Sequence, residues 1–218
     1  MSESAPPITI ILADDHPIIR SGLRTLLETQ PDFLVIGEVG DGLEALRLVE
    51  KMKPRIAVAD VTMPGLNGLD MTRRLRQLSP DTRVIVLSMH TSEAFVGEAL
   101  GNGAAAYIVK DSTLTELVQA VRDVAGGKRF LSPAISRQVI DTYIEKGDMP
   151  TAHKTLTHRE REVFQLVAEG NTNAEIGKRL FISPRTVEVH RANMMKKLGL
   201  KSPMELFAYA VKRGVISF

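Results

Sequence analysis

The sequence contains neither cysteine nor tryptophan among its 218 residues. Without cysteine there is no disulfide, no thiolate nucleophile and no cysteine–zinc site, so proteins that depend on these groups are excluded. No apolar run approaches the roughly 18 residues that a membrane-spanning helix needs. The opening Met-Ser-Glu-Ser lacks the basic and apolar regions of a signal peptide. We therefore expect a soluble cytoplasmic protein with no membrane partner.

Basic and acidic side chains are unevenly distributed along the chain. Residues 151–218 hold 12 Lys or Arg and 6 Asp or Glu, a net charge of +6. The other residues hold 16 basic and 20 acidic side chains, a net charge of −4, which gives the formal total of +2. An acidic first part and a basic second part suggest that only the second part approaches a polyanion. A surface charge difference without any function is the alternative interpretation at this point.

Short apolar segments alternate with segments of helical periodicity between residues 8 and 127. The apolar segments predict strands at 8–13, 33–39, 55–60, 83–89 and 105–109. The periodic segments predict helices at 18–29, 43–52, 69–78, 92–100 and 113–125, with Pro17 in a first turn and a capping box from Thr113 to Glu116. Strands that alternate with helices form a parallel sheet covered on both faces. The predicted fold class of this part is α/β, a (βα)5 doubly wound parallel sheet.

The pattern changes after residue 127. Residues 128–154 carry a short helical pattern that fades into Gly, Pro and polar residues, which is typical of a linker after a connecting helix. Beyond the linker, capping boxes at Thr157 and Thr172 and Ser-Pro pairs at Ser183 and Ser202 predict four short helices. We therefore expect a first domain at 1–127, a linker at 128–154 and an all-α four-helix domain at 155–218.

Asp60 ends the third predicted strand, directly before a turn rich in Pro and Gly. Asp14 and Asp15 follow the first strand, and Ser88 and Lys110 come at the ends of the fourth and fifth. Because the carboxyl ends of parallel strands meet at one edge of a sheet, these side chains should converge there. Three crowded carboxylates repel one another unless a cation lies among them, and an all-oxygen site favours Mg²⁺. Asp60 is thus a candidate acceptor of a phosphoryl group, whose charge Mg²⁺ and Lys110 would offset.

Several separated motifs occur in one order: Asp14-Asp15-His16-Pro17, Asp60-x-x-Met63-Pro64-Gly65-x-x-Gly68, Ser88 and Tyr107-x-x-Lys110. Together they resemble the receiver domain of bacterial two-component response regulators. The resemblance implies strand order 2-1-3-4-5 and phosphorylation of Asp60. It implies a Mg²⁺ site formed by Asp14, Asp15, Asp60 and the Thr62 carbonyl, with Asp14 acting through water. It also implies that Lys110 pairs with the phosphoryl group and that Ser88 and Tyr107 form a switch pair. The sequence departs from many receivers at Asp111, where they have proline.

Two predicted helices of the basic part, at 172–180 and 184–198, are separated by a short turn at 181–183. This arrangement is typical of a helix-turn-helix, whose second helix enters the major groove of DNA. At about 100° per residue, Val187, His190, Met194 and Leu198 share one face of the second helix and should pack inside the bundle.

The expected DNA contacts lie on the other faces of that helix. Glu188 can accept a hydrogen bond from a cytosine amino group, and Val189 and Ala192 can touch a thymine methyl group. Basic side chains of the same helix suit phosphates, as do the free amides at the start of the preceding helix. The complete set of residues expected at DNA is Thr172, Arg185, Thr186, Glu188, Val189, Arg191, Ala192, Asn193, Lys196 and Lys197.

A second resemblance rests on Leu156-Thr157-x-Arg159-Glu160, Asn173-x-Glu175-Ile176, Thr186-Val187-x-x-His190 and Lys197-Leu198-Gly199. These motifs resemble the LuxR-type DNA-binding domain, and with a receiver they are similar to the NarL/FixJ class of response regulators. The resemblance implies a sensor histidine kinase as phosphodonor and a homodimer when the chain is phosphorylated or bound to DNA. In the last helix, Met204, Leu206, Phe207 and Ala210 are candidates for the dimer surface, or they simply close the bundle.

We therefore expect a transcription regulator switched by phosphorylation, and not an enzyme, although a receiver assists its own phosphorylation and dephosphorylation. Ser88 should turn toward the phosphoryl group and Tyr107 should follow inward. The face formed by 94–101 and 105–107 would then change, and either release the basic domain or dimerise.

Two other functions remain as alternatives. A haloacid-type phosphatase also uses an Asp nucleophile at a strand end, but it needs a second acidic residue two positions later, where Thr62 stands. A ligand-sensing LuxR-type regulator with a non-signalling receiver would share the helical domain but would not need Asp14, Asp15, Asp60 and Lys110.

Overall fold

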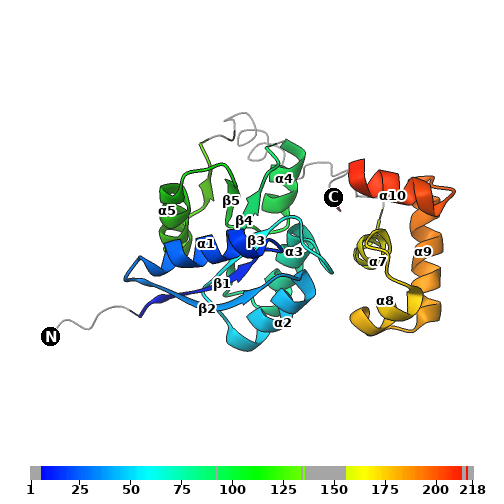
Figure 1. The fold of residues 1–218 in the computed structure, drawn as a ribbon, viewed down its shortest axis with the longest axis horizontal. Coiled ribbons are helices and arrows are strands. Elements are labelled where there is room, and N and C mark those ends of the chain that lie inside the picture. Colours follow the sequence, from blue (N-terminus) through cyan, green and yellow to red (C-terminus); the bar gives the residue numbers. More distant parts are fainter. Residues whose placement is uncertain (1–5, 92, 134, 136–155, 213–214, 216–218) are drawn as a thin grey trace.

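The computed structural model of the chain describes residues 6–91, 93–133, 135, 156–212 and 215. In this part of the chain an α/β region is followed by a smaller helical region (Figure 1). The predicted connecting helix and most of the predicted linker at 128–154 lie outside the described residues. None of the helices in the described ranges is both long enough and apolar enough to span a membrane.

The α/β region is built on a parallel sheet with the strand order β2-β1-β3-β4-β5-β6. Its first five strands match the predicted segments, because each is a short apolar run that packs against helices. The strands are β1 Ile8–Ala13, β2 Phe33–Val39, β3 Ile56–Asp60, β4 Arg83–Ser88, β5 Ala106–Val109 and β6 Phe130–Leu131. The order of β1 to β5 is the one that the resemblance to receivers implies.

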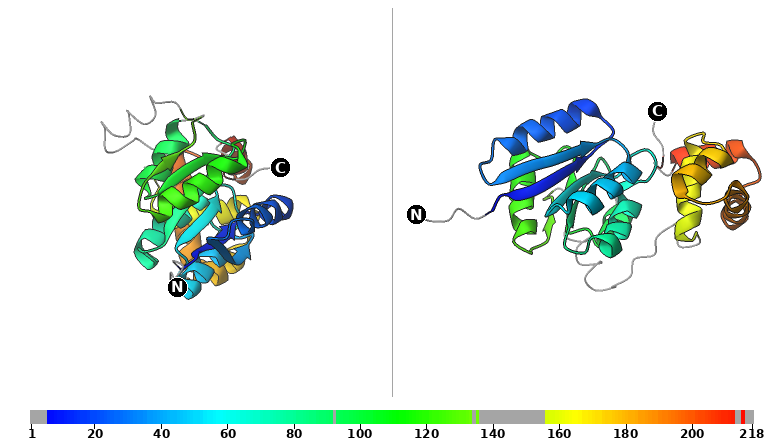
Figure 2. Two further views of the ribbon diagram at one scale, coloured as in Figure 1. Left: turned by 90° about the vertical axis from the view of Figure 1, so that its left-hand side faces the viewer. Right: turned by 90° about the horizontal axis from the view of Figure 1, so that it is seen from below.

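Helices cover both faces of this sheet (Figures 1 and 2). They are α1 Pro17–Glu28, α2 Gly42–Met52, α3 Gly68–Leu78, α4 Glu93–Gly101 and α5 Leu114–Ala125. Successive side chains of a strand point to opposite faces, so Ile10 and Leu12 pack in the core that includes α1 and α5. Ile11 and Ala13 instead pack in the core that includes α2, α3 and α4. The predicted doubly wound α/β fold is confirmed.

The sixth strand has no counterpart among the strands predicted from the sequence. Phe130 and Leu131 pair in parallel with Ala106 and Tyr107 of β5, in a segment that we had assigned to the linker. The predicted capping box before α5 is also wrong, because Thr113 makes no side-chain cap hydrogen bond. Its expected partner, the Glu116 carboxylate, accepts a hydrogen bond from the Ser132 hydroxyl at 3.3 Å instead.

The helical region has the four predicted helices, which are α7 His158–Ala168, α8 Asn173–Leu180, α9 Pro184–Leu198 and α10 Pro203–Lys212. The capping boxes at Thr157 and Thr172 are both formed. The core of the bundle contains Val163, Phe164, Ile176, Val187 and Met194. The helical region lies beside α2, α3 and the loop that follows β3 (Figures 1 and 2).

Candidate functional site

The side chains of Asp14, Asp60 and Lys110 meet at the carboxyl edge of the sheet, as predicted from the strand ends. The Lys110 ammonium lies 2.7 Å from Asp60 Oδ2 and 2.9 Å from Asp14 Oδ2. Both carboxylates are buried, with Asp14 0% and Asp60 4% exposed. One ammonium group therefore holds together two buried carboxylates that come from different strands.

Burial and charge pairing oppose each other at this cluster. Burial raises the pKa of the Asp60 carboxyl, and the hydrogen bond from Lys110 offsets part of this rise. Burial also disfavours the charged form of Lys110, but hydrogen bonds to Asp60 and Asp14 outweigh it and raise the pKa of this lysine. Lys110 is therefore held as a cation beside Asp60, where it can pair with negative charge added to that carboxylate.

Asp14, Asp15, His16 and Asp60 can each direct one ligand atom to a common point, with all four atoms within 4.8 Å of one another. Asp14 Oδ2 and Asp15 Oδ1 are buried, and each lies beside one basic group, Lys110 Nζ at 2.9 Å and His16 Nδ1 at 2.7 Å. Several carboxylate oxygens gathered at one buried point fit a hard divalent cation. Thr62 lies in the loop after β3, and its main chain donates a hydrogen bond to Asp60.

His16 is a further neighbour of this cluster, and no role for it was predicted from the sequence. Its Nδ1 lies 2.7 Å from Asp15 Oδ1, and its main-chain N–H donates to Asp14 Oδ1 at 2.8 Å. The sequence signal was the position of His16 directly after the two aspartates.

Ser88 and Tyr107 meet through the main chain of His90. The Tyr107 hydroxyl donates to the His90 carbonyl at 2.7 Å, and Ser88 Oγ accepts from the His90 N–H at 3.0 Å. Burial raises the pKa of Tyr107 to about 12. The His90 ring stacks on Phe95 of α4 with centroids 4.2 Å apart. The Tyr107 ring is already fully buried in this structure. The structure therefore does not show the outward ring position from which the predicted inward turn of Tyr107 would begin.

The loop from Val61 to Asn67 depends on glycine at several points. A Cβ atom on Gly68 would lie 2.1 Å from the main-chain oxygen of Asp60, and one on Gly42 would lie 1.8 Å from that of Leu66. Gly65 has φ +78°, in the left-handed region that favours glycine. The turn after Asp60 is therefore packed so tightly against β3 and α2 that side chains are excluded.

Helix α9, the second helix of the predicted helix-turn-helix, turns the predicted inner face toward the bundle. Val187 and Met194 are fully buried and His190 and Leu198 are half-buried, so the predicted inner face packs in the bundle. The predicted base-contacting residues Glu188, Val189 and Ala192 are exposed. The other expected DNA residues that are exposed are Thr172, Arg185, Thr186, Asn193, Lys196 and Lys197.

Two of the expected phosphate-binding side chains have partners within the protein. Lys197 Nζ lies 2.7 Å from Glu160 Oε2 of α7, and Arg191 Nη1 donates to Asn173 Oδ1 at 2.8 Å. The first interaction ties α9 to the capping box of α7. For Lys197 it gives a structural role in addition to the predicted contact with DNA.

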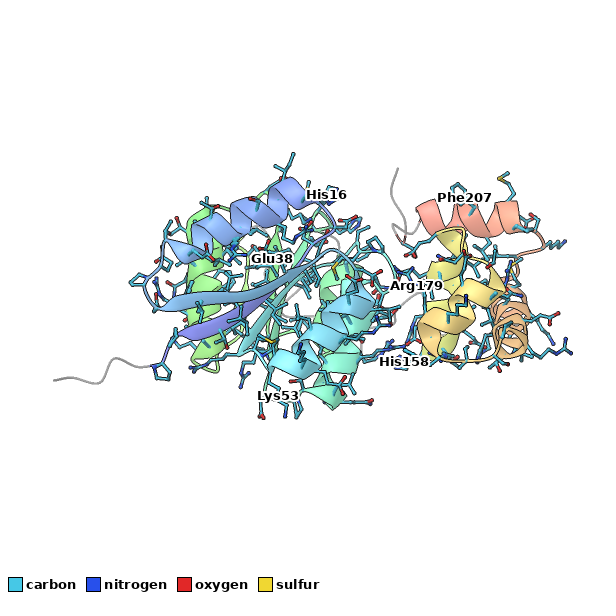
Figure 3. The ribbon with its side chains drawn as sticks, turned by 60° about the horizontal axis from the view of Figure 1, so that its bottom comes forward. His16, Glu38, Lys53, His158, Arg179 and Phe207 are labelled. Carbon is cyan, nitrogen blue, oxygen red and sulfur yellow. The ribbon has the colours of Figure 1, made fainter. Side chains whose placement is uncertain are left out.

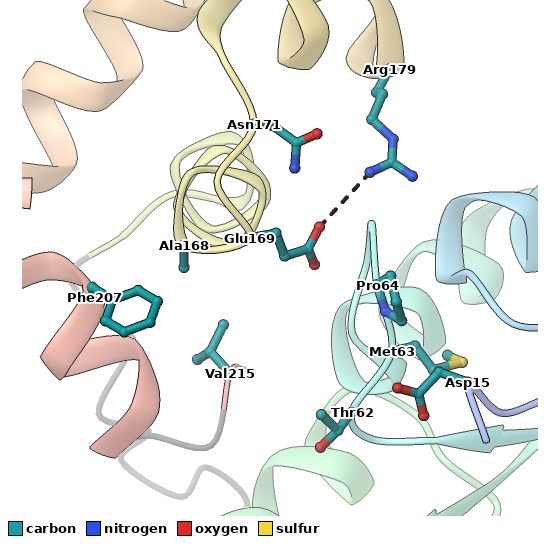
Figure 4. A pocket seen from close by; sticks show the side chains of 10 residues that line it. All are labelled: Asp15, Thr62, Met63, Pro64, Ala168, Glu169, Asn171, Arg179, Phe207 and Val215. Carbon is teal, nitrogen blue, oxygen red and sulfur yellow. Dashed lines mark ion pairs between the residues drawn. The ribbon is translucent and has the colours of Figure 1, made fainter. Parts of the chain in front are cut away.

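The four candidate residues for a dimer surface in α10 do not lie on one exposed face. Leu206 and Ala210 are buried, 3% and 0% exposed, and belong to the core. Met204 is 75% exposed, and Phe207 lines a cavity between the two regions (Figure 4). Leu206 and Ala210 therefore close the helical bundle, which was the alternative to a place in the dimer surface.

The end of α7 contacts the loop after β3 through hydrogen bonds that sequence reasoning did not anticipate. The Gln165 side chain donates to the Met63 carbonyl at 2.6 Å and accepts from the Asn67 N–H at 2.8 Å. The Glu169 carboxylate accepts from the Gly65 N–H at 3.0 Å. The sequence does not reveal these contacts, because the partners of the two polar side chains are main-chain groups about a hundred positions earlier in the chain.

Charged pairs extend this contact to α2 and α3. Arg179 Nη2 lies 2.5 Å from the Asp41 carboxylate at the start of α2, Arg74 pairs with Glu162, and Arg161 Nε lies 3.4 Å from Asp70. Figure 3 places Arg179 on the side of the helical region that faces α2 and α3. We had expected the face formed by 94–101 and 105–107 either to release the basic domain or to dimerise. The contacts of the basic domain lie instead at the β3–α3 loop, α2 and α3.

A cavity of about 500 Å³ lies between the two regions, beside the candidate cation site (Figure 4). On one side it is lined by Asp15 and by the loop residues Thr62, Met63 and Pro64. On the other side it is lined by Ala168, Glu169, Asn171, Arg179, Phe207 and Val215. The helical region thus forms one wall of the space next to Asp15 and the loop after Asp60.

Each of the two regions matches a known protein family. A family model described as response regulator receiver domain matches residues 10–122, and one described as bacterial regulatory proteins, luxR family, matches residues 154–210. The oxygen regulatory protein NreC of Staphylococcus aureus is 35% identical over 215 residues, which cover 96% of this chain and 99% of that protein.

Solved structures of response regulators are also similar to this chain. A LuxR-family two-component response regulator from Aurantimonas sp. is similar with TM-score 0.60 and 39% identity, over 64% of this chain and 99% of that chain. RcsB from Salmonella enterica serovar Typhimurium, bound to the promoter rprA in the presence of phosphomimetic BeF3−, is similar with TM-score 0.61 and 26% identity, over 93% of this chain and 98% of that chain.

Proposed function

The chain belongs to the NarL/FixJ-type two-component response regulators, which join a receiver domain to a LuxR-type DNA-binding domain, and we propose that phosphorylation of Asp60 controls its binding to DNA. The observation that carries the proposal is the pairing of the buried Asp60 carboxylate with Lys110 and Asp14. A sensor histidine kinase is the proposed phosphodonor. The proposed limits are 1–127 for the receiver, 128–154 for the linker and 155–218 for the DNA-binding domain.

The proposed reaction is a transfer of one phosphoryl group. A carboxylate oxygen of Asp60 attacks the phosphorus of a phosphohistidine, the P–N bond breaks, and an acyl phosphate forms while the departing imidazole nitrogen takes up a proton. Lys110 stays beside the new group and pairs with its charge. Ser88, at the end of the neighbouring strand, is the proposed hydroxyl that turns toward the phosphoryl oxygens.

Asp14, Asp15 and Asp60, with the Thr62 carbonyl, are the residues proposed to hold Mg²⁺. This donor set fits the ion, because Mg²⁺ binds through one or two carboxylates and keeps several waters. When bound, Mg²⁺ supplies positive charge to the oxygens of the transferred group. Because the chain itself is modified and the phosphoryl group serves as a signal, we propose that this protein is a phosphoacceptor that assists its own phosphorylation and hydrolysis, and not an enzyme.

We propose that α9 is the helix that contacts DNA. The exposed residues Glu188, Val189 and Ala192 are placed for base contacts, and Arg185 and Lys196 for phosphates. A solved structure of RcsB contains two dimers bound to two parallel DNAs, and we propose that this chain also binds DNA as a homodimer. A cytoplasmic location follows from this proposal, since both DNA and the kinase domain are reached there.

Radioactive phosphate incorporation tests the proposal. The full chain is incubated with labelled acetyl phosphate, with and without Mg²⁺, beside Asp60→Asn. We expect Mg²⁺-dependent, alkali-labile label on the natural chain and none on the variant. Label of equal amount on Asp60→Asn would contradict the assignment of the acceptor.

The two alternative functions find less support. A haloacid-type phosphatase would need an acidic side chain at the position of Thr62, and the family matches cover neither that enzyme class nor its motif. A ligand-sensing regulator with a non-signalling receiver does not account for the Lys110 contacts to two buried carboxylates.

A further inference from the structure

Arg20 of α1 reaches the main chain of the first of the two adjacent aspartates at the sheet edge. Its Nη1 donates to the Asp14 carbonyl at 2.5 Å, and its Nε lies 3.7 Å from the Glu38 carboxylate of β2. Figure 3 shows Glu38 on the sheet beside α1. The Arg20 side chain is 21% exposed, so protein groups surround most of it. One guanidinium thus links α1, the end of β2 and the Asp14 carbonyl.

The carbonyl that Arg20 holds belongs to the peptide group between Asp14 and Asp15. A peptide group is planar, so holding its oxygen restricts the rotation of the whole group and of the main chain on either side. The directions of the Asp14 and Asp15 carboxylates depend on that rotation. The Asp14 N–H donates to the Val39 carbonyl of β2 at 3.1 Å. The main chain of Asp14 is therefore held at both its N–H and its carbonyl oxygen.

The main chain after β2 passes directly beside this hydrogen bond. A Cβ atom on Gly40 would lie 3.4 Å from Arg20 Nη1 and 3.7 Å from the Asp14 carbonyl oxygen. Arg24, one helical turn after Arg20, pairs with the same Glu38 carboxylate and with Glu28. The two arginines therefore share one acidic partner, and it is Arg20 whose guanidinium donates to the Asp14 carbonyl.

We propose that Arg20 is a positioning residue for the cation site, and that it orients the peptide group which aims the Asp14 and Asp15 carboxylates at one point. The proposal rests on the proposed function, since it assumes that Mg²⁺ binds there. Ligand atoms of Asp14, Asp15 and Asp60 lie within 4.8 Å of one another, so a rotated peptide group would move at least one of them away. Groups that orient metal ligands without touching the metal typically change its affinity by about 10- to 100-fold.

The positive charge of Arg20 allows the proposal to be tested by the sign of the effect. A cation beside the site repels a divalent cation, so charge alone predicts that removal of Arg20 strengthens metal binding. Positioning predicts that its removal weakens metal binding. The second effect should be the larger one, because a misdirected carboxylate is lost as a ligand, whereas water screens the charge of a partly exposed side chain.

Binding of Mn²⁺ to the full chain measures the site without a phosphodonor. Mn²⁺ is a suitable probe because it favours carboxylate, carbonyl and water ligands as Mg²⁺ does, and electron resonance detects the free ion. Competition with Mg²⁺ then gives the affinity for Mg²⁺. The test variant is Arg20→Met, which keeps a long side chain without donor or charge. Arg24→Met is the matched control, because it removes the other arginine that pairs with Glu38.

Arg20→Met should bind Mn²⁺ and Mg²⁺ about tenfold more weakly than the natural chain, and Arg24→Met should stay within about twofold of it. When labelled with acetyl phosphate, Arg20→Met should need about tenfold more Mg²⁺ for its half-maximal rate, yet reach the natural rate at saturating Mg²⁺. Arg20→Lys keeps the charge but lacks the guanidinium fork that serves two oxygens at once. Its metal affinity should therefore lie between those of the natural chain and Arg20→Met.

Metal binding by Arg20→Met that equals or exceeds that of the natural chain would overturn the proposal. A reduced labelling rate that excess Mg²⁺ does not restore would also overturn it. If circular dichroism shows that Arg20→Met does not fold, Arg20→Lys decides, and an affinity equal to that of the natural chain would refute the positioning role. Failure of the proposed function looks different, because the natural chain would then carry no label that depends on Asp60, while the metal affinities of the variants would still differ.

Discussion

Lys110 is the residue whose positive charge acts most directly on the Asp60 carboxylate. It contacts two carboxylates that are 5% exposed or less. Without it, both would be buried next to each other without a compensating charge, an arrangement that strongly favours protonation. The lysine therefore favours the ionised form of Asp60, which is the form that can act as a nucleophile.

Lys110→Ala should slow phosphate incorporation from acetyl phosphate by about 100-fold, the usual cost of removing one group that stabilises transferred charge. Lys128→Ala is the matched control, because Lys128 is an exposed lysine that pairs with Asp123 far from the site. The measurement is the initial rate of labelling at saturating Mg²⁺. Rates within twofold of each other for the two variants would show that Lys110 takes no part.

Glu160 provides a pH-dependent contribution to stability. Burial alone would raise its pKa, but hydrogen bonds from Lys197 and Thr157 outweigh burial and lower it below the ordinary value of 4.5. A lowered pKa stabilises the folded state at pH values above 4.5, and this stabilisation is lost as the pH falls through the folded-state value.

Glu160→Gln should therefore unfold more easily than the natural chain at pH 7, by about 1–2 kcal/mol for a lost charged hydrogen bond. Glutamine can still serve in the capping box, so the change isolates the charge. Urea unfolding followed by circular dichroism between pH 3 and 8 should show the difference shrinking below about pH 4.5. A constant difference over the whole range would contradict the linkage argument.

Most of the site residues could be predicted from sequence, because Asp14, Asp15, Asp60, Ser88 and Lys110 each stand at the end of an apolar strand. Topology then brings them to one edge whatever the details of packing. The role of His90 could not be assigned, since its contact with Tyr107 depends on main-chain geometry in the loop after β4. For His16 the only signal was its position directly after the two aspartates.

At the scale of single elements, periodicity accounts for what was predicted correctly and for what was missed. Helices and strands of β1 to α5 bury apolar faces, so their sequence patterns are strong. β6 has only two residues, Phe130 and Leu131, which is too short for any periodic pattern. The predicted capping box at Thr113 failed because Glu116 is within reach of Ser132, a contact that local sequence does not reveal.

The start of α3 provides a test of the turn after Asp60. Gly68→Ala would place a Cβ atom 2.1 Å from the main-chain oxygen of Asp60, so the strand end must shift. We expect a loss of about 3 kcal/mol in unfolding free energy, as for other severe backbone clashes, together with slower phosphorylation. Gly22→Ala, in α1 with nothing within 4 Å, is the control and should gain up to about 1 kcal/mol. Equal stabilities of the two variants would show that the loop has room to relax.

Two neighbouring lysines of α9 should behave differently toward DNA. Lys196 is exposed and suits a phosphate, whereas Lys197 is bound to Glu160. Lys196→Ala should weaken binding to all DNA sequences alike and reduce the slope of log affinity against log salt by about 1, as measured by fluorescence anisotropy. Lys197→Ala should mainly lower stability. The prediction fails if Lys196→Ala changes base preference but leaves the salt slope as it was.

At the scale of the whole molecule, the contact between the domains is polar and could not be predicted. It is formed by Gln165, Glu169 and arginine pairs, and their partners include main-chain groups of Met63, Gly65 and Asn67. Such contacts have no periodic pattern in sequence. The charge difference between the two parts of the chain indicated only that they serve different partners, and said nothing about where they meet.

The function proposed for the whole chain is that a phosphoryl group on Asp60 changes the affinity of α9 for DNA, about 120 positions further along. Everything between these two points, from the Lys110 pair to the Gln165 contacts, matters to function only if that link exists. Binding must therefore be measured with the full chain and a defined phosphodonor.

The most direct test is DNA binding with and without acetyl phosphate and Mg²⁺, on a DNA fragment selected from genomic sequence with the phosphorylated protein. The natural chain should bind on the order of ten- to a hundredfold more tightly after phosphorylation, as is common for coupled sites. Asp60→Asn should bind with the same low affinity under both conditions. Stimulation of Asp60→Asn equal to that of the natural chain would contradict the account.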